Sequence, residues 1–525
     1  MNAHSTPTAA PTGSPAAAQA PWDAELPPAG SLDGTRVVVV GAGFAGLSGA
    51  ACLAHAGADV VLLEKNDRPG GRARVWERDG FRFDMGPSWY WMPDVFERFF
   101  GLFGRRVEDI YRLTRLDPSY RVVFGPEDTV DMPAGVEAAA ELFERMEPGA
   151  GEELRSYLAD AAYKYERGMG EFVHKPSLSL LEFADPTMLW ALVRLQMLQS
   201  FRGHVRRHFD DPRIRQIMEF PVLFLGSTAT DTPALFSLMN HADLALGTWY
   251  PEGGIGAVVE GMARVAEDEG AELATGTPVR RILVEGGRVV GVETGSGDRI
   301  DADVVLAGAD YHHVEQHLLE PEHRQYSARY WERRTLSPSS LIFYLGVEGR
   351  VEGLEHHTLF FDEPLDEHAD AIYESPRWPE RPLFYVSATS RTDPDVAPAG
   401  HENLCILIPL APDLPDAEET RERYYDIVME RLERYAGHSI RDRVVLKRSY
   451  AHTDFRDDYN ALGGNAYGLA NTLRQTALLR PRLRSKKVDG LYFAGQLTVP
   501  GPGVPPAVIS GEVAARQIVE DTFRA

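Results

Sequence analysis

Two short apolar runs separated by a helix-like stretch predict a strand–helix–strand unit near the start of the chain. Residues 36–40 read RVVVV and residues 59–64 read DVVLLE, each typical of a strand buried on both faces. Residues 44–56 lie between them, are rich in alanine and leucine, and predict a helix. A strand, a crossover helix and a second, parallel strand form the βαβ unit from which nucleotide-binding domains are built.

Later apolar runs predict the remaining strands. Residues 279–294 alternate around Gly286 and Gly287 as in a hairpin, and a buried strand follows at 303–307. The runs LIFYLGV, PLFYVSA and NLCILIPL between residues 341 and 409 predict the sheet of a second domain, and residues 491–494 predict a last short strand. Nucleotide-type segments therefore occur near both ends and in the middle, so we expect both domains to be discontinuous in sequence.

The stretch from Val95 to Arg215 is mostly helical in pattern, apart from a strand at 120–124, and predicts a separate cap. Between residues 191 and 215, six arginines stand against two aspartates, beside apolar residues at helical spacing. This contrast indicates a face that docks on a membrane, and the alternative is a helix packed on its own core with a solvated basic edge. The apolar positions are Leu189, Leu192, Val193, Met197 and Phe201, and the nearby arginines are Arg194, Arg202, Arg206 and Arg207.

Composition and charge narrow the class of protein. The 525 residues, 44% of them hydrophobic, give room for two or three cores. With 54 basic and 78 acidic residues the net charge is -24, which disfavours a nucleic-acid partner. Cys52 and Cys405 alone provide no disulfide framework and no cysteine cluster for a metal, so a reducing, cytoplasmic compartment is expected.

Neither the first residues nor the longest uncharged run predicts a membrane-spanning segment. The first thirty residues lack the basic and apolar regions of a signal peptide, and their alanine, proline and small polar residues predict a disordered tail. Residues 37–58 carry no charge and could span a bilayer by length, but their five glycines belong to a nucleotide-binding turn. We therefore expect no transmembrane helix.

The sequence VVVVGAGFAGLSGA places a G-x-G-x-x-G motif between the first strand and its helix. Gly41 allows the tight turn, Gly43 lets the backbone approach a pyrophosphate, and Gly46 allows the helix to pack closely on the sheet. The helix N-terminus stabilises the phosphate charge. Glu64 ends the second strand and can accept hydrogen bonds from ribose hydroxyls, which favours FAD or NAD over NADP. The alternative is a glycine-rich turn that serves packing alone.

A second glycine motif follows within a few residues of Glu64. Gly70 and Gly71 permit another close approach of the backbone, and Arg72 offers a guanidinium to phosphate or carbonyl oxygens, unless it is a surface ion-pair residue. The stretches PGGRARVWERDGFRFDMGPS, WYPEGGIGAVVEGMARVAEDEGAEL and LYFAGQLTVPGPGVPPAVISGEVAA together resemble the bacterial-type phytoene desaturases of the FAD-dependent amine oxidase and carotene desaturase superfamily. The similarity runs from about Arg36 to the end of the chain.

The resemblance implies the fold and the cofactor site. It implies an α/β fold, with a Rossmann-like FAD-binding domain, a mixed-sheet substrate domain and a helical membrane-facing cap. The C-terminal strand, the loop from Gly501 and a helix over residues 508–515 would close over the flavin, and Gln496 stands where several amine oxidases carry an acid. The implied FAD-binding residues are Gly41, Gly43, Phe44, Ala45, Gly46, Glu64, Lys65, Gly71, Arg72, Gly86, Pro87, Ser88, Val279, Gly495, Gln496, Gly503 and Val504; no metal is expected.

The predicted domains follow the same resemblance. They are a disordered tail, 1–34; the FAD-binding domain, 35–94, 236–312 and 451–525; and the helical cap and substrate domain, 95–235 and 313–450.

The resemblance also implies the reaction. The substrate would be phytoene or a related acyclic carotene precursor, held by shape in an apolar tunnel, and flavin would accept a hydride before the neighbouring carbon loses a proton. The electrons would pass to quinone or oxygen, and the protein would lie in the cytoplasm on the membrane surface. Trp249 and Tyr250 could stabilise a carbocation or simply pack in the core. His241, Asp243, His452 and Asp454 are proton-acceptor candidates by type, but structural roles suit each better, so no catalytic residue is assigned.

Two other functions fit the same residues. A carotenoid isomerase or hydroxycarotenoid desaturase of the same superfamily would share the cofactor site and differ in the shape of the tunnel. A lipid escort protein without redox chemistry is a third possibility. The glycine motif, Glu64 and Arg72 together argue against the escort protein, because a carrier needs no pyrophosphate site.

Overall fold

The structure is a computed structural model that describes residues 25–179, 199–226, 228–472 and 475–524. The predicted tail over residues 1–24 and the helical positions from Leu189 to Met197, with Arg194, lie outside the described residues. The chain is ordered before residue 35, where the predicted tail ends. Leu32 is buried in the core and its N–H donates to Ala56 O at 2.8 Å.

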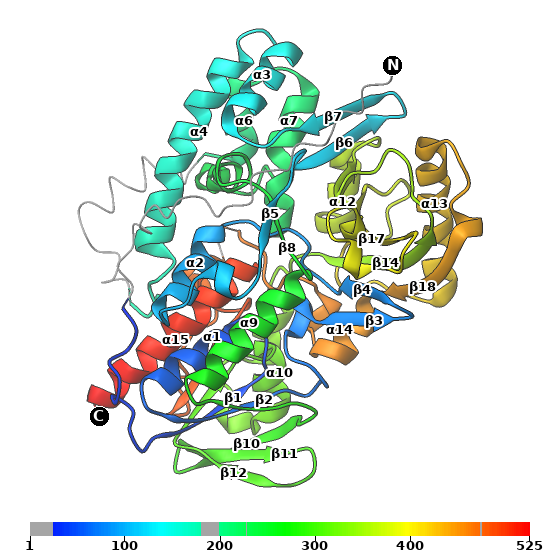
Figure 1. Ribbon diagram of the computed structural model, residues 1–525. Coiled ribbons are helices and arrows are strands. Elements are labelled where there is room, and N and C mark those ends of the chain that lie inside the picture. Colours follow the sequence, from blue (N-terminus) through cyan, green and yellow to red (C-terminus); the bar gives the residue numbers. More distant parts are fainter. Residues whose placement is uncertain (1–24, 180–198, 227, 473–474, 525) are drawn as a thin grey trace.

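A five-stranded parallel sheet forms the core of the first domain, in the order β19-β13-β1-β2-β9. Helix α1 packs against this sheet between α9 and α15, in the lower part of Figure 1. The sheet joins strands from the start, the middle and the end of the chain, as the discontinuous pattern predicted. Its elements are β1 (Arg36–Val40), α1 (Phe44–His55), β2 (Asp59–Leu63), α9 (Ile255–Asp268), β9 (Glu272–Ala274), β13 (Val304–Ala307), β19 (Leu491–Phe493) and α15 (Val504–Arg524).

A seven-stranded sheet forms the core of the second domain, in the order β18-β14-β17-β16-β15-β6-β7. Its pairs are antiparallel except β15 with β6. One face packs on α13 and the other turns toward the first domain, since side chains alternate between the faces of a strand. The elements are β6 (Tyr120–Gly125), β7 (Asp128–Met132), β14 (Ser339–Glu348), β15 (His357–Phe360), α12 (Leu365–Tyr373), β16 (Phe384–Ser387), β17 (His401–Leu410), α13 (Glu418–Ala436), β18 (Val444–Tyr450) and α14 (His452–Tyr459).

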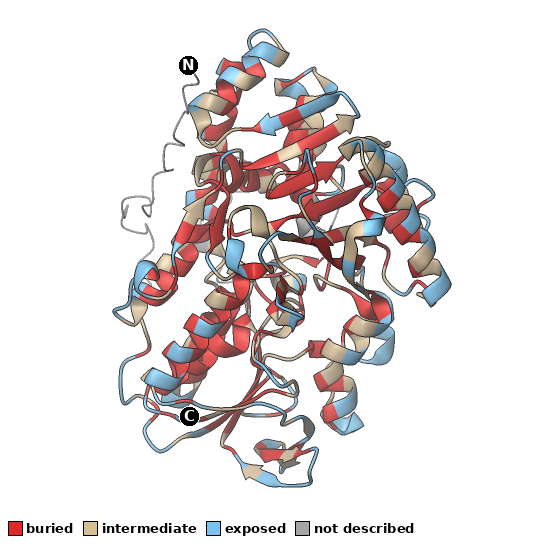
Figure 2. Ribbon diagram, turned by 45° about the vertical axis from the view of Figure 1, so that its right-hand side comes forward, coloured by how far each residue is buried: buried red, intermediate tan, exposed pale blue. Residues whose placement is uncertain are grey.

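Helices α3, α4, α6 and α7 lie at the upper left of Figure 1, α2 lies lower beside α15, and small sheets connect the parts. Figure 2 shows that the strands of both large sheets are mostly buried, whereas exposed residues lie on the outer helices and turns. The helices are α2 (Pro93–Leu102), α3 (Val136–Met146), α4 (Ala150–Arg167), α6 (Phe201–His208), α7 (Pro212–Glu219) and α8 (Leu238–Asn240). The small sheets comprise β3 (Val75–Arg78) with β4 (Phe81–Asp84), β5 (Leu113–Arg115) with β8 (Trp249–Pro251), and β10 (Val279–Glu285) with β11 (Arg288–Thr294) and β12 (Arg299–Asp301).

Two helical segments depart from the sequence-based expectations. The last helix begins at Val504, not at residue 508, because Pro505 and Pro506 occupy its first turn, where proline needs no backbone N–H. Helices α10 (Tyr311–His313) and α11 (Ala328–Glu332) pack with the parallel sheet through Tyr311 and Trp331. We therefore propose that the second segment of the FAD-binding domain extends past residue 312 to Glu332.

The arginines of α6 form ion pairs or hydrogen bonds with neighbouring side chains of the protein. Arg202 forms ion pairs with Glu219 and Asp366, and Arg206 lies 3.6 Å from Glu219. Arg207 donates to Gln199, and Phe201 is buried in the core. In the described part of the predicted docking face, the helix thus packs on the protein's own core, which was the alternative to membrane docking. None of the helices in the described ranges has both the length and the hydrophobicity that a membrane-spanning segment requires.

Candidate functional site

The first glycine turn joins β1 to α1 at the carboxyl edge of the parallel sheet. Gly41 has a φ of +96°, which a residue with a side chain rarely adopts. A Cβ at Gly46 would lie 1.9 Å from Gly41 O, so this glycine lets the helix start directly against the turn. A Cβ at Gly43 would meet nothing within 4 Å, because Gly43 borders open space. The turn therefore presents bare backbone and a helix N-terminus to that space.

Glu64 fixes this turn from the end of the neighbouring strand. Its Oε2 accepts a hydrogen bond from Ala42 N at 2.9 Å, and its Oε1 accepts from Asn66 N at 2.9 Å and Asn66 Nδ2 at 2.8 Å. The carboxylate is 4% exposed and lines the same space as Gly43. Each carboxylate oxygen can accept more than one hydrogen bond, so ribose hydroxyls can still bind here.

Arg72 follows the second glycine turn. Gly70 N donates to Ala42 O at 2.7 Å, which ties the two turns together. With the Gln496 amide oriented to satisfy its neighbours, its oxygen accepts from Arg72 Nη2 at 2.9 Å. Arg72 Nε is buried without a partner among the described residues, and burial lowers the pKa of the guanidinium. Arg72 thus combines a positive charge with an unsatisfied donor, as an anionic or carbonyl-bearing ligand requires.

Asp310 is a site residue that the sequence reasoning missed. It follows β13 on the carboxyl edge of the sheet, and its Oδ1 accepts from His313 N at 3.1 Å. Its Oδ2 is buried without a partner in the described part of the chain, and burial raises the pKa of the carboxyl to about 6. Gly308 and Asp310 after a buried strand repeat the pattern seen after β1, which could have identified this turn.

The C-terminal segment closes the same space from the opposite side. Gly495, with a φ of +106°, donates its N–H to Ser510 Oγ at 2.9 Å, and Ser510 donates to Val499 O at 2.7 Å. The buried guanidinium of Arg480 donates to Gln496 O and Leu469 O, each at 3.2 Å. These bonds hold the proline-glycine loop and the start of α15 beside the first glycine turn.

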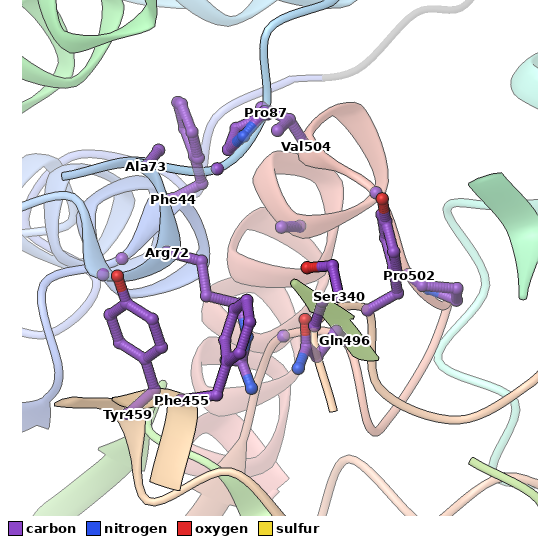
Figure 3. A pocket seen from close by; sticks show the side chains of 18 of the residues that line it. Phe44, Arg72, Ala73, Pro87, Ser340, Phe455, Tyr459, Gln496, Pro502 and Val504 are labelled. Carbon is purple, nitrogen blue, oxygen red and sulfur yellow. The ribbon is translucent and has the colours of Figure 1, made fainter. Parts of the chain in front are cut away.

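One cavity of about 620 Å³ joins these segments. Sixteen of the seventeen predicted residues line it, and Gly46 instead packs beneath the turn. Figure 3 looks into it, with Arg72, Phe455 and Tyr459 on the left and Ser340, Gln496 and Pro502 on the right. The lining residues among the predicted ones are Gly41, Gly43, Phe44, Ala45, Glu64, Lys65, Gly71, Arg72, Gly86, Pro87, Ser88, Val279, Gly495, Gln496, Gly503 and Val504.

The far half of the cavity is apolar and lies over one face of the seven-stranded sheet. Leu359, Tyr385 and Leu407 come from three neighbouring strands and share this face, as the register of β15, β16 and β17 requires. Aromatic and aliphatic side chains from other elements complete the wall. They include Trp89, Trp91, Met92, Phe220, Met239, Phe361, Leu365, Ile372 and Leu383.

The aromatic residues proposed from sequence lie elsewhere. Trp249 donates to Leu246 O at 2.9 Å and Tyr250 donates to Asp393 at 3.2 Å, and neither lines the cavity. Strand β8 directs them into the protein core through its pairing with β5, so core packing was the correct alternative. Trp89, Trp91 and Phe220 supply the aromatic faces of the cavity.

The four proton-acceptor candidates have structural partners and none lines the cavity. Asp243 accepts from Tyr120 Oη at 2.8 Å, and His452 Nε2 lies 2.8 Å from Ala411 O. Asp454 accepts from Ala451 N at 2.8 Å, and the ring of His241 packs on Tyr165 at 5.3 Å. Asp243 is linked to the wall, because Thr248 donates to it at 3.3 Å and accepts from Trp91 Nε1 at 2.8 Å.

The donors and spaces of this cavity fit FAD. The glycine turn and helix N-terminus would hold the pyrophosphate, Glu64 the ribose, and Val279 would lie beside the adenine. The rest of the FAD molecule would contact Arg72, Gln496 and the backbone around Gly495. Arg72 Nε and Asp310 Oδ2, which have no partner among the described residues, are the hydrogen-bonding groups open to it. A dinucleotide cavity that continues into an apolar chamber defines an FAD-dependent oxidoreductase.

Comparison with known proteins gives the family. The sequence model of a protein family, described as flavin containing amine oxidoreductase, matches residues 44–519, so the chain belongs to this family. Within the family it belongs to the carotenoid desaturases. It is 47% identical over 491 residues to a carotenoid 3,4-desaturase of Haloarcula japonica, covering 93% of this chain and 99% of that protein. It is 34% identical over 496 residues to a zeta-carotene-forming phytoene desaturase of Myxococcus xanthus, covering 93% and 95%.

A solved structure supports the fold alone. An oxidoreductase from Methanosarcina mazei superposes with a TM-score of 0.56 at 16% sequence identity, covering 93% of this chain and 100% of that one. The arrangement of a parallel dinucleotide sheet beside a larger mixed sheet is therefore shared at low identity.

Proposed function

We propose that the protein desaturates an acyclic carotenoid, by hydride transfer to FAD and loss of a proton from the neighbouring carbon. The observation that carries this proposal is the continuity of the cofactor half of the cavity with a chamber walled by apolar and aromatic side chains. A polyene offers no group for a charged clamp, so shape and apolar contact must orient it. Bound FAD would supply the hydride acceptor.

The chain's own residues have three tasks in this reaction. The wall from Leu359 to Leu407 orients the polyene and excludes water from the reacting carbons. Trp89, Trp91 and Phe220 present π faces that stabilise positive charge developing on the polyene. Arg72 and the glycine turns hold the cofactor at the mouth of the apolar half.

Two reactions are candidates, the desaturation of phytoene and the desaturation of a carotenoid at its 3,4 position. We propose that the second is the stronger candidate. Phytoene or a related acyclic carotene precursor is the substrate that the family resemblance implies. The 47% identity to a protein named carotenoid 3,4-desaturase, against 34% to one named phytoene desaturase, favours an already conjugated acyclic carotenoid.

Pigment analysis tests both candidates. The chain is expressed in one host that accumulates phytoene and in another that accumulates lycopene, and the pigments are separated and identified by mass. A product two hydrogens lighter than lycopene is expected in the second host, and coloured products in the first would favour phytoene instead. A Gly43→Glu variant, which directs a carboxylate into the cofactor half, is the control and should form neither. Unchanged pigments in both hosts, from a protein that carries FAD, would overturn the proposal.

Peripheral membrane contact is a separate proposal, motivated by the insolubility of the substrate. The arginines around α6 give it little support, since Arg202 and Arg206 are ion-paired with acidic side chains of the protein. Binding to anionic liposomes is compared for the wild type and a variant with Arg202, Arg206 and Arg207 changed to glutamine. Equal binding of the two proteins would remove α6 as the docking element.

A further inference from the structure

A polar cluster interrupts the apolar wall of the cavity close to Gly86 and Pro87. Tyr385 Oη lies 3.0 Å from Ser88 Oγ and 2.5 Å from His357 Nδ1. Ser88 and Tyr385 line the cavity, whereas His357 lies behind them and is fully buried. The cavity therefore has one phenol hydroxyl that is backed directly by an imidazole.

The sheet register creates this contact. His357 in β15 is paired with Ser387 in β16, and Leu359 with Tyr385, so His357 and Tyr385 are diagonal neighbours on the same face. The ring of His357 stacks on Trp89 with centroids 4.2 Å apart and planes at 10°. This stacking and the edge contact with the ring of His356 hold the imidazole with Nδ1 directed at the phenol.

The imidazole is neutral and has one nitrogen without a partner. Burial holds the pKa of His357 well below its ordinary value, and the ring of His356, 4.5 Å away, acts in the same direction. His357 Nε2 makes no hydrogen bond among the described residues. In the tautomer with the proton on Nε2, Nδ1 accepts the Tyr385 hydrogen bond and is free to take up that proton.

We propose that Tyr385 is the catalytic residue that receives the proton in the desaturation, with His357 as its relay, an inference that rests on the proposed function. The C–H bond next to the cationic carbon breaks and its electron pair becomes the new C=C bond. The proton goes to Tyr385 Oη as the phenol proton moves to His357 Nδ1. Bound oxidised FAD would accept the hydride from the first carbon, so one two-electron oxidation and one proton loss account for each double bond.

A weakly basic imidazole is sufficient for this step. A C–H bond beside a carbocation is far more acidic than an imidazolium, so the transfer needs a positioned acceptor rather than a strong base. Ser88 hydrogen-bonds to Tyr385 from the other side and orients the phenol.

Exchange of solvent deuterium tests the transfer. The FAD-loaded protein is incubated with its carotenoid in liposomes prepared in D₂O, and deuterium in the recovered substrate and the rate of product formation are both measured. Tyr385→Phe is expected to lose exchange and to slow product formation by about 100-fold or more, with flavin content and carotenoid binding retained. His357→Asn, which keeps an acceptor oxygen for Tyr385 but cannot take up its proton, should behave in the same way.

A matched control removes a different hydroxyl from the same cavity. Tyr373 also lines the cavity, and its Oη is buried without a hydrogen-bond partner among the described residues. Tyr373→Phe should retain deuterium exchange whatever its effect on the overall rate. Exchange and product formation within threefold of wild type in both Tyr385→Phe and His357→Asn would overturn the proposal. A wild-type protein that carries FAD but converts no carotenoid would instead contradict the proposed function.

The tautomer of His357 provides a test without substrate. In protein labelled with ¹⁵N at histidine, the His357→Asn variant identifies the resonances of His357. A protonated Nε2 and an unprotonated Nδ1 are expected. A proton fixed on Nδ1 would mean that the histidine donates to Tyr385 and cannot accept from it, which would overturn the relay whether or not the enzyme is active.

Discussion

Arg98 in α2 and Glu512 in α15 form an ion pair that is almost closed to solvent. The two terminal nitrogens of Arg98 donate to the two carboxylate oxygens at 3.0 and 2.6 Å, and the side chains are 5% and 3% exposed. The pair fastens the last helix of the chain to the segment that follows the second glycine turn.

Removal of one member of this pair should destabilise the protein strongly. Glu512→Ala leaves the Arg98 charge buried without compensation, so we expect a loss of about 3–5 kcal/mol in the free energy of unfolding, measured by denaturant titration. The control is Asp268→Ala, which breaks the Arg105–Asp268 pair of 2.7 Å at 46% and 44% exposure and should cost about 1 kcal/mol or less. Equal losses in the two variants would contradict this account.

A side chain at Gly511 should separate α1 from α15. A Cβ at this position would lie 2.3 Å from Ala45 O and 2.7 Å from Gly49 N, both of them backbone atoms that cannot turn aside. Gly511→Ala should therefore lower the free energy of unfolding by about 1–3 kcal/mol and reduce the FAD retained through gel filtration. Gly101→Ala in α2, where a Cβ meets nothing within 4 Å, should instead stabilise the protein by about 0.5–1 kcal/mol.

Two neighbouring arginines should differ in their effect on FAD binding. Arg72 lines the cavity and forms no ion pair within the described ranges, whereas Arg74 is paired with Asp458 at 2.6 Å and lies outside the lining. Arg72→Met should weaken FAD binding by about 10- to 150-fold, the loss of one charged hydrogen bond, in a fluorescence titration of the apoprotein. Arg74→Met should weaken it less, and an equal effect would argue against direct contact between Arg72 and the cofactor.

The buried Asp243 should make stability fall as the pH rises from about 4 to 7. Burial raises the pKa of this carboxyl from 3.8 to about 7, so in that range the folded state holds a proton that the unfolded state has released. The unfolded state then binds fewer protons than the folded state. The free energy of unfolding is therefore lower above pH 7 than below pH 4, by about 4 kcal/mol from Asp243 alone. Asp243→Asn should flatten this part of the stability curve in thermal unfolding at several pH values. An unchanged slope would show that other groups cause it.

The cofactor half of the site could be predicted because its requirements are local. Gly41, Gly43 and Glu64 follow from how the backbone must turn after one strand and where the next strand ends. Helix α15 begins before the predicted residue 508, because Pro505 and Pro506 are well tolerated in the first turn of a helix.

The substrate half could not be predicted in the same way. Tyr385 and His357 are 28 residues apart and meet only through the register of β15 and β16. Trp249 and Tyr250 are aromatic and close to a glycine motif, but the pairing of β8 with β5 turns them into the core. Which face of a strand a side chain occupies depends on pairing with distant strands, and residue type alone does not contain that information.

The hydrogen bond from Ser48 Oγ to Val508 O, 2.8 Å long, joins two helices whose contact residues are 460 positions apart. The wall that the last helix forms over the first glycine turn thus does not exist while a ribosome is still making the middle of the chain. Until then the nascent protein exposes the apolar side of α1 and half of a nucleotide cleft. The cofactor cleft is consequently complete only once α15 has docked on α1, and until then the uncovered apolar side of α1 favours aggregation.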